Sequence, residues 1–334
     1  MADALVELEN GTEIDGWIVH KLLGKGGFGA VYTVQKGDQV HAMKTEVKSD
    51  STKLLKMEVY VMRQLNQAGA RHFVTCIDSG IYKDQFSYVV MTMIGVSLQD
   101  VRKMCVGQKF SLGTAIYVGI QSLEAIEEMH NVGYLHRDIK PSNYALGKDD
   151  LNKIYLLDFG MCRKDIKPSN YALGKDDLNK IYLLDFGMCR KYLDEQAQPR
   201  LPRVSVGFRG TVRYAPLSCH IRRETCRKDD MESWLYQQIE ITRGALPWRS
   251  IDDRNEVAMY KERCRYGINL QEMMGGCPRE YIEILRYIDS IRYYDIPNYK
   301  KIYKLLEQAI KNLKLKLHPL DWFHFPALQP NKKP

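Results

Sequence analysis

The sequence lacks the features that mark secreted, disulfide-stapled or membrane-spanning proteins. Its eight cysteines form no Cys-x-x-Cys pair, so we expect a reduced, intracellular and most simply cytoplasmic setting. The first 16 residues carry five acidic side chains before any apolar run, and no secretory signal is expected there. No apolar run is long enough to span a bilayer. We therefore expect no contact with a membrane. We also expect the protein to be a monomer.

The charge balance is moderately basic and gives little specific information. The 334 residues carry a formal net charge of +8, with 45% hydrophobic and 27% charged residues. This chain is long enough to bury one large core or two adjoining lobes. Charges of both signs are mixed along it, which indicates a solvated surface first and attraction to acidic substrates second. No nucleic-acid-binding motif accompanies the charge, so nucleic acid is not an expected partner.

The stretch with the clearest chemistry is 136–143, which reads His-Arg-Asp-Ile-Lys-Pro-Ser-Asn. These side chains supply what phosphoryl transfer needs: Asp138 to accept a hydroxyl proton, Lys140 to steady the moving phosphoryl group and Asn143 to hold a metal ion. Fifteen residues after Asn143, an Asp-Phe-Gly turn offers Asp158 as a second metal ligand.

Residues 138–164 are repeated letter for letter as 165–191. Perfect identity over this length indicates a very recent duplication or a sequence error. The second copy offers Asn170 and Asp185 as alternative metal ligands, but only the first copy follows His136 and Arg137. We expect the first copy to be catalytic and the second to be an insertion, because loop entropy rises only ~0.6 kcal/mol per doubling of length. A hybrid of Asp138 with Asp185 stays open.

The N-terminal region predicts short strands joined by a glycine-rich turn. The strands are expected at 17–23, 30–34 and 39–45. The turn holds Gly24, Gly26 and Gly29, where backbone amides can approach phosphate oxygens, and Val31 follows to cover a flat base. A dinucleotide site would require a helix after the loop and an acidic residue about 20 positions on. Here a β-type run follows, and Lys44 lies 20 positions after Gly24.

Lys44 ends the run 40–44 within the expected strand 39–45, and it is predicted to aim its amine at the α and β phosphates. The next segment, 53–65, has apolar residues at helical spacing. A helix packed on the sheet would bring its Glu58 against Lys44.

The rest of the chain alternates strands and helices. We expect strands at 73–78 and 86–92, and a long helix capped by Ser111 and ended by Gly133. Further helices are expected at 229–242, 255–266, 279–288 and 298–313. The tail from Pro319 is expected to be irregular.

These motifs, in this order and spacing, resemble the eukaryotic protein kinase family. Three details are similar to the casein kinase I superfamily: Gly207 to Ala215, Asp229 to Ser233, and Leu246-Pro-Trp248. The runs at 56–59, 89–91 and 135–143 look most like its tau-tubulin kinase branch. The resemblance implies a two-lobed α+β fold, ATP with Mg²⁺, and transfer to serine or threonine of proteins in acidic or phosphorylated contexts. It implies an extension at 1–16, lobes at 17–94 and 95–313, and a tail at 314–334.

The resemblance also implies roles for further residues. Ala42, Met91 and Met93 would contact the adenine, with 92–94 as the hinge beside it. Asp230 would brace the catalytic loop. Arg213, with Arg209 as a weaker candidate, would receive an acidic or phosphorylated substrate residue.

Three departures from the family pattern support an alternative, a kinase-fold binding protein without full catalysis. The first is the duplication itself. The second is the group of polar residues in the helix after Asp230, namely Gln237, Gln238, Thr242 and Arg243, each of which costs free energy when buried without a partner. The third is Pro216-Leu217 after the Tyr-Ala pair.

Overall fold

A computed structural model describes residues 6–26, 29–47, 54–147, 154–156, 182–183 and 188–328. The chain forms two compact units. Unit 1 comprises 1–97, 142–187 and 327–334, and unit 2 comprises 98–141 and 188–326.

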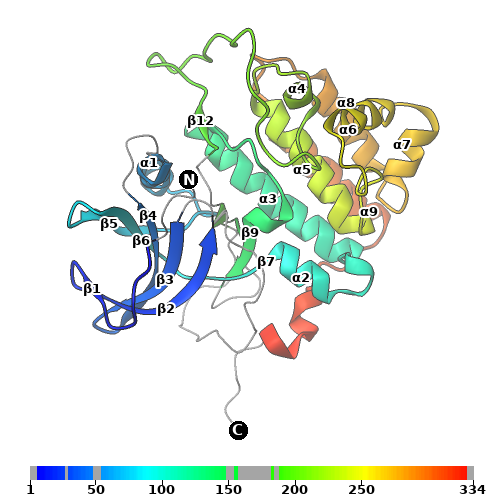
Figure 1. Cartoon of the computed structure of the whole chain (residues 1–334). Helices are drawn as coiled ribbons and strands as arrows, with labels where there is room; N and C mark the ends of the chain where they lie inside the picture. The colour runs from blue at the N-terminus through cyan, green and yellow to red at the C-terminus, as the bar shows by residue number, and fades with distance from the viewer. Residues whose placement is uncertain are drawn as a thin grey trace. The chain divides into compact units, whose positions relative to one another are not determined.

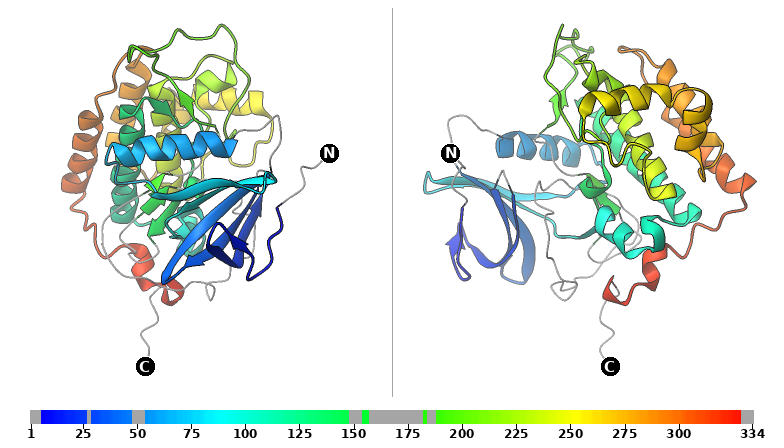
Figure 2. Two further views of the ribbon diagram at one scale, coloured as in Figure 1. Left: turned by 90° about the vertical axis from the view of Figure 1, so that its left-hand side faces the viewer. Right: turned by 45° about the vertical axis from the view of Figure 1, so that its right-hand side comes forward.

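The main sheet of unit 1 is antiparallel, with strand order β1-β2-β3-β4-β6-β5 (Figure 1). Its strands are β1 (Glu13–Ile14), β2 (Trp17–Gly26), β3 (Gly29–Lys36), β4 (Gln39–Val47), β5 (Cys76–Tyr82) and β6 (Phe86–Met91). Helix α1 (Leu54–Gln67) packs against β5 and β6 (Figure 2, left). The prediction of a strand at 73–78 is wrong in its bounds. In the structure, β5 begins at Cys76 and ends at Tyr82.

Gly29 shows why glycine is needed where β3 begins. Its φ is +140°, and a Cβ there would lie 1.8 Å from the Thr45 carbonyl oxygen of β4. Only a residue without a side chain allows β3 and β4 to approach this closely.

A second, small sheet of unit 1 contains parts of both sequence copies. Its strands are β7 (Ile94–Ser97), β9 (Tyr144–Gly147), β10 (Ile154–Leu156) and β11 (Tyr182–Leu183). Tyr155 of the first copy and Tyr182 of the second both have Ala145 as their partner on β9. Tyr155 and Tyr182 are the same residue of the repeat, so the extra strand pairs in the same register as the original.

Unit 2 is mainly helical, and α3 and α5 pack side by side in it (Figure 1). Its elements are α2 (Leu98–Met104), η1 (Val106–Gln108), α3 (Leu112–Asn131), β8 (Tyr134–Leu135), β12 (Arg190–Lys191), α4 (Leu217–His220), α5 (Arg227–Arg243), α6 (Arg254–Arg263), α7 (Gly267–Met274), α8 (Glu280–Ser290), α9 (Tyr299–Asn312) and η4 (Asp321–His324). Ser111 caps α3, and Gly133 follows its end with φ +87°, as the sequence predicted.

Most polar groups of α5 find partners, although nearly the whole helix is buried. The Gln238 amide donates to the Ala115 carbonyl at 2.6 Å and to the Tyr281 hydroxyl at 2.8 Å. The Thr242 hydroxyl donates to the Gln238 carbonyl at 2.7 Å. Among the described residues, the Gln237 amide has no hydrogen-bond partner. The predicted cost of polar residues in this helix therefore falls on Gln237 and on the side-chain oxygen of Gln238, which also has no hydrogen-bond partner among the described residues.

The tail is more ordered than the sequence predicted. Trp322 is fully buried and its ring meets Phe110 edge-on, at 5.6 Å between centroids. The Asp321 carboxylate accepts hydrogen bonds from the Ser111 backbone and hydroxyl, both at 2.7 Å, and from the Thr114 hydroxyl at 3.0 Å. The expectation of an irregular tail is therefore wrong for η4, which packs against the start of α3. Among the described residues, no helix is both long and apolar enough to cross a membrane.

Candidate active site

Lys44 and Glu58 form a buried ion pair in unit 1. The Lys44 amine donates to the two carboxylate oxygens of Glu58 at 2.8 and 2.7 Å. The side chains are only 5% and 8% exposed. Strand β4 supplies the lysine and helix α1 the glutamate, so the pair joins the sheet to its helix. A buried pair of this kind is stable only with good geometry, and the two short hydrogen bonds provide it.

The lysine shares its face of the sheet with the side chains predicted to contact adenine. Val31 pairs with Lys44 across β3 and β4, and Ala42 pairs with Met91 across β4 and β6. Directly paired residues point to the same face, as do residues two apart on a strand. Val31, Ala42 and Met91 are all at least 96% buried. Met93 is half-buried just after β6.

The glycines of the predicted phosphate loop lie where β2 and β3 pair. Gly24 pairs with Val31, and Gly26 with Gly29. The tip between them, 27–28, lies outside the described residues.

The predicted metal ligands are only partly described. Asn143 is buried, and the Ser142 hydroxyl is 3.5 Å from its side-chain oxygen. Asp158, Asn170 and Asp185 lie outside the described residues. Within the described part of the chain, no three His, Cys, Asp or Glu side chains cluster in a way that would hold a metal ion.

In unit 2, Asp138 lies at the centre of a polar cluster. The Lys140 amine donates to Asp138 Oδ2 at 2.5 Å, and the backbone N–H of Thr211 donates to Oδ1 at 2.8 Å. The same lysine is 3.2 Å from the Thr211 hydroxyl. The carboxylate is 2% exposed and the lysine 20%. The sequence analysis missed Thr211, because nothing local links it to a loop 73 residues away.

Asp230 holds the backbone that presents Asp138. Its carboxylate accepts from the backbone N–H groups of His136 and Arg137, both at 2.8 Å, and from His130 Nε2 at 2.9 Å. Arg137 has a left-handed φ of 70°, a strained value that these bonds help to maintain. Burial opposes ionisation of Asp230, but the hydrogen bonds and charges of the histidines hold its pKa below the usual range.

The Arg137 side chain links the first copy to the end of the second. Its guanidinium donates to the carbonyls of Met188 at 2.5 Å and Cys189 at 3.5 Å. Arg190 in β12 also pairs with Leu135 in β8. The chain that follows Asp185 in sequence is thus fastened beside the loop of Asp138.

Comparisons with known proteins agree with these observations. Residues 17–164 match the model of the protein kinase domain. The serine/threonine-protein kinase spe-6 of Caenorhabditis elegans is 31% identical over 323 residues, which cover 94% of this chain and 77% of the relative. The chain belongs to the serine/threonine protein kinase family.

Two further relatives are similar over more than nine-tenths of this chain. A protein of Dictyostelium discoideum named as a probable serine/threonine-protein kinase is 31% identical over 93% of the chain. The casein kinase I homolog RAG8 of Kluyveromyces lactis is 27% identical over 95% of it. The chain spans 57% and 56% of the lengths of these two relatives. The similarity to RAG8 supports a place in the casein kinase I group, and the tau-tubulin branch stays a prediction.

The two arginines predicted to bind a substrate anion differ in their surroundings. Arg213 is 34% exposed in its side chain, and its guanidinium is 3.5 Å from the buried carboxylate of Glu240. Glu240 also accepts from the Tyr214 hydroxyl. Arg209 is exposed. A substrate anion at Arg213 would therefore share the guanidinium with Glu240.

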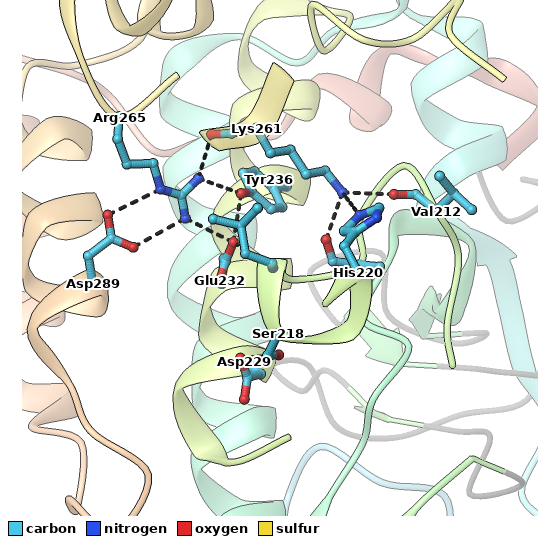
Figure 3. Close-up of polar contacts among 11 residues, drawn as sticks. Val212, Ser218, His220, Asp229, Glu232, Tyr236, Lys261, Arg265 and Asp289 are labelled. Carbon is cyan, nitrogen blue, oxygen red and sulfur yellow. Dashed lines mark hydrogen bonds and ion pairs between the residues drawn. The ribbon is translucent and has the colours of Figure 1, made fainter. Parts of the chain in front are cut away.

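A buried lysine without a local sequence signal, Lys261, is bonded to the backbone at Val212 (Figure 3). Lys261, from α6, donates to the carbonyls of Val212 at 2.7 Å and Ala215 at 2.6 Å, and lies 3.2 Å from His220 Nε2. Its side chain is fully buried, and burial lowers the pKa of Lys261 to about 7. The anchored carbonyls flank Arg213 and follow Thr211, which contacts Asp138.

A neighbouring network is centred on the buried carboxylate of Glu232 (Figure 3). Glu232 accepts from the Leu217 backbone N–H at 3.1 Å, the Tyr236 hydroxyl at 2.7 Å and Arg265 at 2.9 Å. Arg265 continues to Asp289 at 3.2 Å. The unusual Pro216-Leu217 pair is thus accommodated, because the backbone N–H of Leu217 donates to the buried carboxylate of Glu232.

Proposed function

We propose that this kinase transfers the γ-phosphate of ATP to serine or threonine hydroxyls of proteins. The observation that carries the proposal is the cluster in which Lys140 and the Thr211 N–H hold the two oxygens of Asp138. A carboxylate is a hydrogen-bond acceptor, so Asp138 held in this position is suited to accept a hydrogen bond from a substrate hydroxyl and orient it. Lys140 supplies positive charge where negative charge develops during transfer.

ATP and Mg²⁺ are the ligands that the family implies, and the described residues fit them. Val31, Ala42 and Met91 form an apolar, buried surface suited to a flat base, and Lys44 on the same face supplies a fixed cation for phosphates. Gly24, Gly26, Gly29 and Met93 would complete the contacts. The buried carboxamide of Asn143 offers the oxygen ligand that Mg²⁺ prefers. When bound, Mg²⁺ neutralises charge on the phosphates.

For the second metal ligand, we propose Asp185 in place of Asp158. Support comes from the flanking chain: Arg137 and β8 hold Met188 to Arg190, only three residues after Asp185. Asp138 and Asn143 would still come from the first copy, which gives the hybrid. Asp185→Asn is expected to abolish transfer, whereas Asp158→Asn retains it. The opposite result would assign the metal to the first copy.

We propose acidic or phosphorylated proteins as substrates. Arg213 and Arg209 are the candidate anion ligands, and Arg200, Arg203 and Arg222 are exposed in the same segment of the chain. Arg213→Ala is expected to reduce kcat/KM on an acidic peptide more than on a neutral peptide of the same length. Arg209→Ala serves as the matched comparison. Equal losses on both peptides would make Arg213 structural.

We also propose an intracellular monomer. The buried Cys219, Cys226 and Cys264 are free thiols, which fits a reducing compartment. A light-scattering mass of 38.7 kDa would support the monomer, and twice that value would overturn it.

The decisive experiment measures phosphate transfer by the full chain. The purified protein, ATP and Mg²⁺ are incubated with casein as a generic acidic substrate. Transfer is expected for wild type and absent for Lys44→Met, and circular dichroism checks that this variant is folded, because it removes the lysine that pairs with the buried Glu58. Wild type that binds nucleotide but transfers nothing would overturn the proposal. Full turnover in a folded Lys44→Met would reject the nucleotide site.

A further inference from the structure

Strand β4 carries a second buried acidic contact two residues after Lys44. Glu46 is 7% exposed, and its Oε2 accepts a hydrogen bond from the backbone N–H of Leu55 at 2.9 Å. Leu55 is the second residue of α1, where the backbone N–H groups have no partner within the helix. A side-chain oxygen that accepts from this position acts as a helix cap. Here the cap comes from a strand of the sheet, nine residues earlier in the chain.

The charge of Glu46 also suits this position. The first turn of α1 contains no acidic residue, so Glu46 supplies the negative charge that stabilises a helix N-terminus. Burial raises the pKa of Glu46, while the Leu55 N–H and the nearby charge of Lys44 oppose that rise. A carboxylate removed from water in this way needs a partner, and Leu55 provides it.

Two contacts therefore join β4 to α1. Glu46 holds Leu55, and Lys44 holds Glu58. Lys44 and Glu46 are two apart on β4, so they share a face and lie ~6.7 Å apart. Leu55 and Glu58 are three apart on α1, which corresponds to a rise of ~4.5 Å along the helix. The two contacts have comparable spans on both elements, so together they fix the helix in position and in angle.

We infer that Glu46 is a positioning residue that sets the first turn of α1 so that Glu58 reaches Lys44. The inference rests on the proposed kinase function for its effect on catalysis. Its effect on the helix does not depend on that function.

The helix itself provides the first test, by hydrogen exchange on the full chain. Glu46→Ala is expected to accelerate exchange of the amides from Leu55 to Glu58. Glu13→Ala, an exposed glutamate of β1, is the control and should leave these amides unchanged. Unchanged exchange in Glu46→Ala would overturn the inference, whether or not the protein transfers phosphate.

Catalysis provides the second test, with Glu46→Ala, Glu46→Gln and Glu58→Ala. Glu46→Ala is expected to lower kcat/KM about tenfold, the equivalent of ~1.4 kcal/mol for loss of a cap. Glu46→Gln should stay within about threefold of wild type, because its amide oxygen can still accept from Leu55.

The double variant Glu46→Ala/Glu58→Ala separates positioning from general loss of stability. If Glu46 acts through Glu58, the double variant should be no slower than Glu58→Ala alone. Losses that multiply, or a Glu46→Ala protein as active as wild type, would overturn the inference. An inactive wild type would instead refute the proposed function, and hydrogen exchange would then decide on Glu46 by itself.

Discussion

Lys261 makes a stability measurement across neutral pH informative. Burial is the main cause that lowers its pKa from 10.5 to about 7, and the charge of Arg265 adds to the effect, whereas Glu232 and Cys219 act in the opposite direction. Burial, followed by the charge of Lys261, lowers the pKa of the adjacent His220 to about 4. His220 therefore stays neutral near pH 7 and can accept a hydrogen bond from the lysine.

The sign of the effect follows from which state binds the proton. Between pH 7 and 10 the unfolded chain carries a proton on Lys261 that the folded chain largely lacks. The free energy of unfolding therefore rises with pH through this window and is lowest below about pH 7. For a pKa of 10.5 unfolded and about 7 folded, this single residue contributes a rise of about 2 kcal/mol between pH 6.5 and 8.5.

The perturbation is Lys261→Met, which keeps most of the length of the side chain and removes the amine. Urea denaturation at a series of pH values gives the free energy of unfolding for both proteins. Titrating groups that do not interact with Lys261 cancel in the difference between wild type and variant, so this difference should rise by about 2 kcal/mol from pH 6.5 to 8.5. Lys300→Met, which removes an exposed lysine of α9, is the control and should give a flat difference. A flat difference for Lys261→Met would refute the reasoning.

Three further predictions concern the repeat, a close contact and the tail. Asp138→Asn is expected to abolish phosphate transfer while Asp165→Asn spares it, since only Asp138 follows the loop held by Asp230; the reverse activities would show that the second copy is catalytic. Gly113→Ala should destabilise the protein by roughly 1–3 kcal/mol, because the new Cβ would lie 2.1 Å from the backbone oxygen of Lys316; an unchanged urea midpoint would contradict this. Trp322→Ala should cost about 3–5 kcal/mol in the same assay, since the ring is fully buried; a loss below 1 kcal/mol, on the same scale, would mean that the tail contributes little.

The sequence alone predicted the elements whose signals are local. Ser111 and Gly133 lie at the two ends of α3 because a cap and a left-handed glycine act within one turn of the helix. The glycine-rich turn between β2 and β3 follows from residues adjacent in the chain. The positions of Lys44 and Glu58 also came from local spacing, on a strand and on a helix. Their motifs were specific enough to indicate the kinase family before any contact was known.

Only the tertiary structure decided what depends on residues far apart in the chain. Lys261 has no local signal, because its partners lie 41 to 49 residues earlier. The tail was wrongly expected to be irregular, since Asp321 finds its partners more than 200 residues away. The two repeat copies are identical letter by letter, so no property of their own residues can distinguish them. Their contacts do, because Arg137 precedes one copy and binds the end of the other.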